Sequence, residues 1–147
     1  MKKRRVINIE AAKIILCIAL FLESLIDIRK RRVCIWLPIL TAGAGVLCAI
    51  INDSLSLQEL MLDFGITAIF FTISKVSKEA LGIGDVWVIG SILIVMGVMD
   101  GIGILFLSFL LAAVYGGVLW AKNKRKDGTF PFVPFLFLGT IGGVWIG

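Results

Sequence analysis

The chain has 147 residues, of which 59% are hydrophobic and only 17% are charged. Soluble domains carry about a quarter charged residues, so this composition excludes an ordinary soluble protein and favours a single membrane domain, residues 1–147. The basic residues that give the net charge of +5 lie between apolar segments, which argues against nucleic-acid binding. The absence of histidine excludes imidazole catalysis.

Apolar segments separated by short polar stretches follow one another along the chain. At about 20 residues per crossing, the chain has room for about six transmembrane helices, so we expect an all-α polytopic membrane protein. Gly97, Asp100, Gly101 and Gly103 mark a predicted turn that divides one long apolar segment. The predicted spans are residues 9–26, 33–51, 60–74, two spans within 86–121, and 128–147. Pro38 falls in the first turn of the second span.

The polar connectors predict the orientation in the membrane. They comprise residues 27–32, 52–58, 75–80 and 122–127. Alternating crossings gather ten Lys and Arg residues on one side, which we therefore expect to be cytoplasmic. The basic residues 2–5 conflict with this orientation, and a first segment lying along the membrane interface would remove the conflict.

Two carboxylates stand at the ends of predicted spans. Asp27 follows the first span, and Asp85 opens the fourth span after Gly82 and Gly84. In the alternating topology both lie at the cytoplasmic face, at a similar depth. Two neighbouring carboxyl groups hold one proton between them, which suits an aspartyl protease that activates water. The pair would titrate as a unit, so the sequence does not decide which aspartate is the base.

Residues around the aspartates fit this chemistry. Gly82 and Gly84 lack side chains, so a substrate backbone can approach closely beside Asp85. Glu23 lies four residues before Asp27, hence on the same helical face. Glu23 either opposes the ionisation of the Asp27 carboxyl group or forms an ion pair with a nearby arginine, and we expect the ion pair.

At these residues the chain resembles the type IV prepilin peptidases, membrane aspartyl proteases with a Gly-x-Gly-Asp motif. Three blocks match in the family's order: residues 27–33, residues 80–86, and residues 130–136 with Pro131, Phe132 and Pro134. The resemblance implies catalysis by Asp27 and Asp85 and no cofactor or metal. Gly82, Gly84, Pro131, Phe132 and Pro134 are the expected motif or substrate-binding residues.

The resemblance also implies what the substrate is. A prepilin-like protein, with a basic leader, a cleavage site after Gly and an apolar helix, would be cut at the cytoplasmic face of the cell membrane. The chain lacks the cysteine-bearing insertion of larger members, which implies a short form without methyltransferase activity. It departs from the family pattern at Cys34-Ile35, at Trp87 where Lys is usual, and at Val133 where Gly is usual.

Other interpretations of the sequence remain. The departures at Cys34-Ile35 and Trp87 motivate a degenerate relative that acts as a membrane scaffold or binds prepilins without cutting them. Asp27 and Asp85 could instead carry protons in a small transporter. We expect structural roles for Asp63 and Asp100 and do not expect Ser74, Ser77, Lys75 and Lys78 to form a serine–lysine site. Cys17, Cys34 and Cys48 lack paired spacing and are expected to pack without metal.

Overall fold

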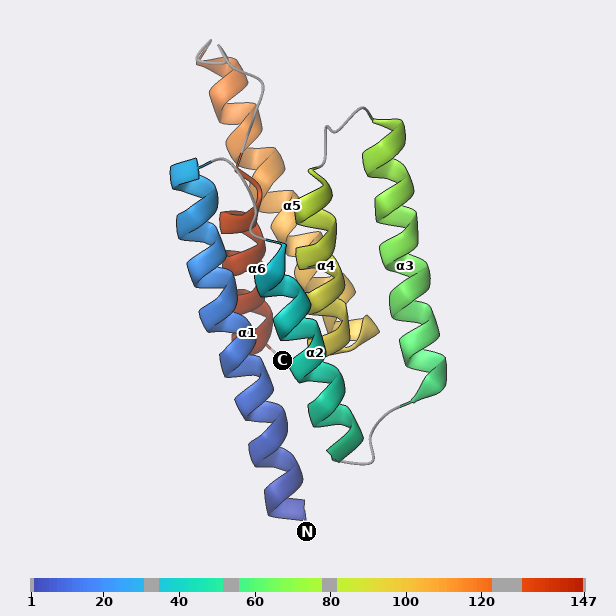
Figure 1. Ribbon diagram of the computed structural model, residues 1–147. Coiled ribbons are helices and arrows are strands. Elements are labelled where there is room, and N and C mark those ends of the chain that lie inside the picture. The colour runs from blue at the N-terminus through green and yellow to red at the C-terminus, as the bar shows by residue number, and fades with distance from the viewer. Residues whose placement is uncertain (1, 31–34, 52–55, 78–81, 123–130, 147) are drawn as a thin grey trace.

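A computed structural model describes residues 2–30, 35–51, 56–77, 82–122 and 131–146. Every secondary-structure element in these ranges is an α-helix, as predicted, and consecutive helices run in opposite directions (Figure 1). The carboxyl ends of α1, α3 and α5 therefore meet the amino ends of α2, α4 and α6 at one end of the bundle. The helices are α1 (Lys2–Lys30), α2 (Trp36–Ile51), α3 (Leu57–Val76), α4 (Ile83–Met96), α5 (Val98–Ala121) and α6 (Val133–Ile146).

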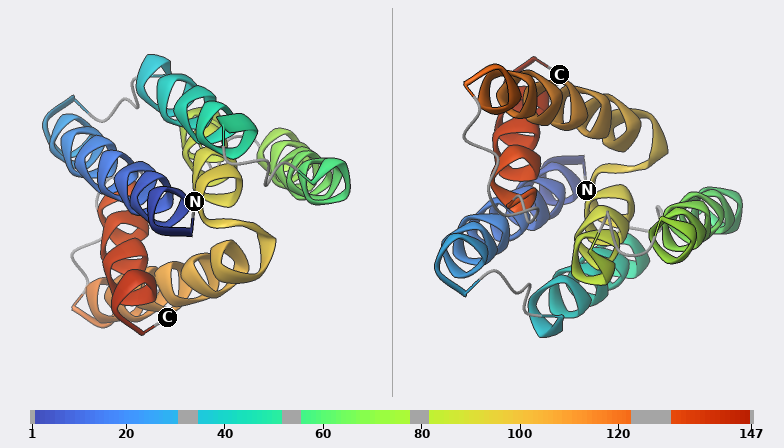
Figure 2. Two further views of the ribbon diagram at one scale, coloured as in Figure 1. Left: turned by 90° about the horizontal axis from the view of Figure 1, so that it is seen from below. Right: turned by 90° about the horizontal axis from the view of Figure 1, so that it is seen from above.

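Helix α4 lies at the centre of the bundle. It contacts all the other helices, and α1 additionally packs against α2 and α6 (Figure 2). Its sequence is almost uniformly apolar, which is the pattern of a helix buried all round. Asp85 in its first turn is the exception. The central helix thus carries one of the two predicted catalytic carboxyl groups at one end of the bundle.

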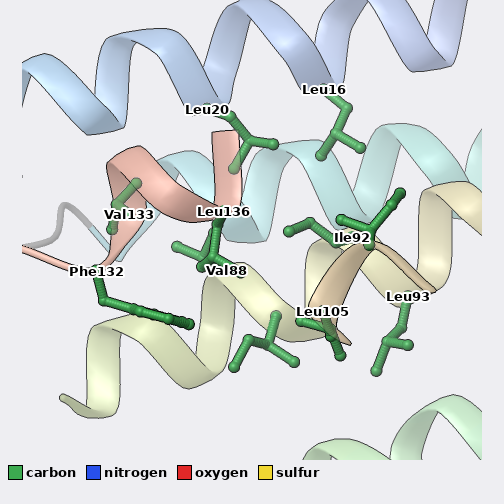
Figure 3. Packing of buried hydrophobic residues seen from close by; sticks show 11 residues of the cluster. Leu16, Leu20, Val88, Ile92, Leu93, Leu105, Phe132, Val133 and Leu136 are labelled. Atoms are coloured by element: carbon green, nitrogen blue, oxygen red, sulfur yellow. The ribbon is translucent and has the colours of Figure 1, made fainter. Parts of the chain in front are cut away.

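The core joins α1, α4, α5 and α6 (Figure 3). The side chains at its centre are branched aliphatic residues that are almost completely buried, and aromatic rings extend the core toward α3. The rings of Phe109 and Phe132 have centroids 5.0 Å apart, and those of Phe70 and Phe109 are 6.0 Å apart. The core residues are Leu16, Leu20, Val88, Ile89, Ile92, Leu93, Ile104, Leu105, Phe132, Val133 and Leu136.

Helices α5 and α6 approach closely because α6 presents glycines to α5. A Cβ added at Gly143 would lie 2.5 Å from Ile104 Cγ1, and one added at Gly139 would clash with Ser108 Oγ. Glycines four residues apart permit this close backbone approach, as in membrane helix pairs. The packing fixes α6 against α5 and thereby positions the amino end of α6.

The turn between α4 and α5 is shorter than predicted. Gly97 alone makes the reversal, with φ of +83°, and α5 starts at the next residue. A positive φ is accessible to glycine without steric cost, so one residue suffices. Asp100, Gly101 and Gly103 were wrongly assigned to this turn, because they lie in the first turns of α5.

Three other predicted boundaries are corrected. Helix α3 begins at Leu57, because the Ser56 side chain accepts a hydrogen bond from the Glu59 amide and caps the helix. Its last residue is Val76, so it is longer than the predicted span of residues 60–74. Helix α1 continues from Lys2 to Lys30 without a break, so residues 2–8 form no separate segment and Asp27 lies within the helix.

Two helices, α3 and α5, are long and apolar enough to cross a membrane, and α2, α4 and α6 are shorter apolar helices. Most side chains of α3 and α5 face outward, since only 11% and 17% of their most apolar segments are buried. An apolar surface of this extent is unusual for a soluble monomer. Of the residues predicted as basic or polar connectors, 31–32, 52–55, 78–80 and 123–127 lie outside the described residues.

Candidate active site

Asp27 lies on the face of α1 that packs against α6. Its side chain is only 7% exposed. The backbone amide of Val133, the first residue of α6, donates a hydrogen bond to the Asp27 carboxylate. The Oδ2 atom is buried and has no hydrogen-bond partner. Because a helix amino end carries a partial positive charge, α6 both holds this carboxylate and stabilises its ionised form.

Asp85 is the third residue of α4, and its carboxyl group folds back toward the start of its own helix. The backbone amide of Gly82, the residue that caps α4, donates a hydrogen bond to it. This is the reciprocal half of a capping box, in which an acid at the third helical position satisfies the amide of the capping residue. A capping role and a catalytic role are compatible, because the hydrogen bond fixes the orientation of the carboxyl group.

Gly82 is placed so closely against Asp85 that a side chain there would touch the carboxyl group. A Cβ added at Gly82 would lie 3.2 Å from Asp85 Oδ2. Gly84 is half-buried in the first turn of α4. The Gly-x-Gly-Asp motif is therefore the start of a helix, and its first glycine leaves room for the acid.

The structure brings Asp27 and Asp85 together from α1 and α4, at the same end of the bundle (Figure 1). Asp85 interacts electrostatically with Asp27. Two carboxylates that interact in this way oppose each other's ionisation, which is the condition for a pair that shares one proton. Arg29, Lys75 and Lys122 end or flank their helices at this same end of the bundle.

Glu23 is a third carboxyl group beside this pair. It is 1% exposed, and neither of its oxygens has a hydrogen-bond partner. It interacts electrostatically with Asp85. The predicted ion pair with an arginine is therefore wrong, because the side chain points into the bundle. Across the described part of the chain, no group of three or more His, Cys, Asp or Glu side chains is arranged to hold a metal ion.

The third sequence block reaches the site through the amino end of α6. Phe132 is buried in the core against Phe109, and Val133 is completely buried. Pro131 and Pro134 are half-buried on either side of them. The sequence did not predict that this block would supply a backbone amide to Asp27, since a backbone donor leaves no residue-type signal.

The other candidate residues lie elsewhere. Asp63 is buried on α3, with Oδ1 unpartnered, and lines a small cavity of about 50 Å³ with Ser56 and Glu59, at the end of α3 away from Asp85. Ser74 is buried, whereas Lys75 is exposed with its ammonium 5.7 Å from the ring centre of Phe71. Cys17 and Cys48 are half-buried, and Cys34 and Lys78 lie outside the described residues.

Comparison with protein-family models decides the family. The model of the type IV leader peptidase family matches residues 14–117, a segment that includes Glu23, Asp27 and the glycine motif with Asp85. The chain belongs to the type IV leader peptidase family. No curated protein and no solved structure matches it.

Family membership makes this chain a peptidase, as the sequence predicted. The match ends within α5, so it does not extend to the amino end of α6. In the structure, α6 nevertheless completes the surroundings of Asp27. In this chain the last helix thus holds an acid that belongs to the first helix.

Proposed function

We propose that this leader peptidase is an aspartic endopeptidase that cleaves the basic leader from prepilin-like precursors. Asp27 and Asp85 are the proposed catalytic pair. The observation that carries the proposal is their electrostatic interaction: two carboxyl groups from α1 and α4, far apart in sequence, interact at one end of the bundle.

The proposed reaction requires one proton on the pair. The ionised aspartate takes a proton from water as the water attacks the scissile carbonyl carbon, and the protonated aspartate donates to the carbonyl oxygen. The amides of Val133 and Gly82 support this chemistry, because each holds one carboxyl group in a fixed orientation. No cofactor takes part in the proposed reaction.

We further propose that residues 1–147 form one domain that crosses the cell membrane several times. The apolar surfaces of α3 and α5 and the apolar character of α2, α4 and α6 support this. Arg29, Lys75 and Lys122 lie at the carboxyl ends of α1, α3 and α5, at the same end of the bundle as the aspartates, which supports a cytoplasmic active site. The bilayer would then bring the apolar helix of the substrate to the enzyme and leave its leader at the cytoplasmic face.

We propose that the substrate backbone binds beside the glycine motif. Gly82 and Gly84 leave the surroundings of Asp85 open to a substrate backbone. Trp87, which replaces the usual Lys, is 45% exposed and two residues from Asp85, so it projects from another face of α4. This position supports an active peptidase over a degenerate relative that only binds prepilins or serves as a scaffold.

A cleavage assay tests the proposal. Purified peptidase in lipid is incubated with prepilins that carry a basic leader, a Gly cleavage site and an apolar segment. Asp27→Asn and Asp85→Asn should each abolish cleavage while the variant remains folded, and Asp100→Asn, an exposed acid at the other end of the bundle, serves as the control. Full processing by either active-site variant would refute the proposal that Asp27 and Asp85 form the catalytic pair. A fully inactive wild type would favour the scaffold or a proton-coupled transporter.

A further inference from the structure

Glu23 is a carboxyl group at a position where the helix otherwise presents apolar side chains. Leu16 and Leu20 precede it and Asp27 follows it at spacings of three and four residues, so the four side chains form one stripe along α1. All four are buried, and Leu16 and Leu20 belong to the core. A leucine at position 23 would extend the core, whereas a buried carboxyl group without a partner destabilises the fold strongly when it is charged.

The elements packed against α1 offer Glu23 no positive charge. On α4 the charged group beside it is Asp85, and on α1 the next side chain of the stripe is Asp27. Within its described range, α6 carries no titratable side chain, and α2 carries only Cys48, near its far end. The charged groups that surround Glu23 among the described residues are therefore both acidic.

We propose that Glu23 is a third acid of the site, a positioning residue that exchanges protons with the Asp27–Asp85 pair and thereby sets the pH range in which the pair holds one proton. The inference rests on the proposed function. Glu23 acts through Asp85 and does not touch the peptide bond that is cut.

The sign of its effect follows from the charges. A negative charge on Glu23 opposes the loss of the last proton from the pair, because it would leave three like charges in one poorly solvated place. The pair therefore keeps its proton to higher pH than it would alone. Replacing Glu23 with a neutral isostere removes this opposition, and the pair loses its last proton at lower pH.

The pH profile of prepilin cleavage tests this inference. For Glu23→Gln, we expect the alkaline limb to move by about one pH unit toward lower pH. Glu23→Asp keeps the acid, so its alkaline limb should lie close to that of the wild type. Glu10→Gln removes the same charge from an exposed position on the same helix and should leave the limb unchanged. An identical alkaline limb for Glu23→Gln and the wild type would overturn the inference.

A second measurement does not depend on activity or on the folding of the variant. Infrared spectra of the wild-type peptidase in lipid, with and without carbon-13 labelling of glutamate, identify the carbonyl band of a protonated glutamic acid. We expect such a band at neutral pH and its loss over the pH range of the alkaline limb. A band that persists through the alkaline limb would show that Glu23 is uncharged while the pair loses its last proton and would refute the inference, whereas a wild type with the expected loss of the band but without cleavage would refute the proposed function alone.

Discussion

The backbone amide of Val133 donates a hydrogen bond to the carboxylate of Asp27, and this contact ties the last helix of the bundle to the first. Val133 opens α6, so the contact also places a helix amino end against the acid. The adjacent Phe132 packs its ring against Phe109, and Pro131 and Pro134 are half-buried beside it. We therefore expect the block at residues 131–134 to position the amide that holds Asp27.

Removing the Val133 amide should impair catalysis without unfolding α6. Val133→Pro deletes the N–H at the first helical position, where proline is well tolerated. A hydrogen bond to a charged group contributes about 1.5–3 kcal/mol, so we expect kcat for prepilin cleavage to fall about ten- to hundredfold. Val133→Ala removes apolar bulk but keeps the amide, and serves as the matched control. Equal kcat values for the two variants would show that the hydrogen bond does not matter for catalysis.

Adding a side chain at Gly82 should displace the Asp85 carboxyl group. In Gly82→Ala the new Cβ would lie 3.2 Å from Asp85 Oδ2, so either the acid or the turn must shift by a few tenths of an ångström. Since displacements of this kind at a catalytic group are costly, we expect at least a tenfold loss of kcat/KM, measured by the cleavage assay.

Gly103→Ala is the control for this change. It lies on α5 with nothing within 4 Å of the added Cβ, so it introduces alanine without a new contact. Alanine favours a helix over glycine by about 1 kcal/mol, and the thermal stability of Gly103→Ala should equal or exceed that of the wild type. Unchanged activity of Gly82→Ala would refute the close packing of Gly82 on Asp85.

The orientation of the bundle predicts which ends of the helices face the cytoplasm. In a background with Cys17, Cys34 and Cys48 replaced by alanine, Lys122→Cys and Glu59→Cys place single thiols at exposed positions on opposite ends of the bundle. In intact cells, a membrane-impermeant maleimide should label Glu59→Cys only. Permeabilisation should expose Lys122→Cys, and Lys75→Cys should behave like Lys122→Cys. Labelling of Lys122→Cys in intact cells would reverse the proposed orientation.

Much of the site could be predicted from local sequence. The catalytic role of Asp85 was predicted from its position at the start of an apolar segment. That of Asp27 was predicted from its position at the end of another apolar segment. The shared face of Glu23 and Asp27 follows from helical spacing. The predicted ion pair of Glu23 with arginine failed because spacing along one helix does not say whether that face is covered. Here α4 and α6 cover it, and the carboxyl group is buried.

The sequence by itself determined that this chain is a bundle of apolar helices with two aspartates at helix ends on the same side, because hydropathy and charge are properties of each segment alone. Only the tertiary structure decided which groups surround those aspartates. The amide of Val133 and the buried carboxyl group of Glu23 come from segments more than a hundred residues apart. Their meeting depends on the packing of α1 against α4 and α6, which no local pattern encodes.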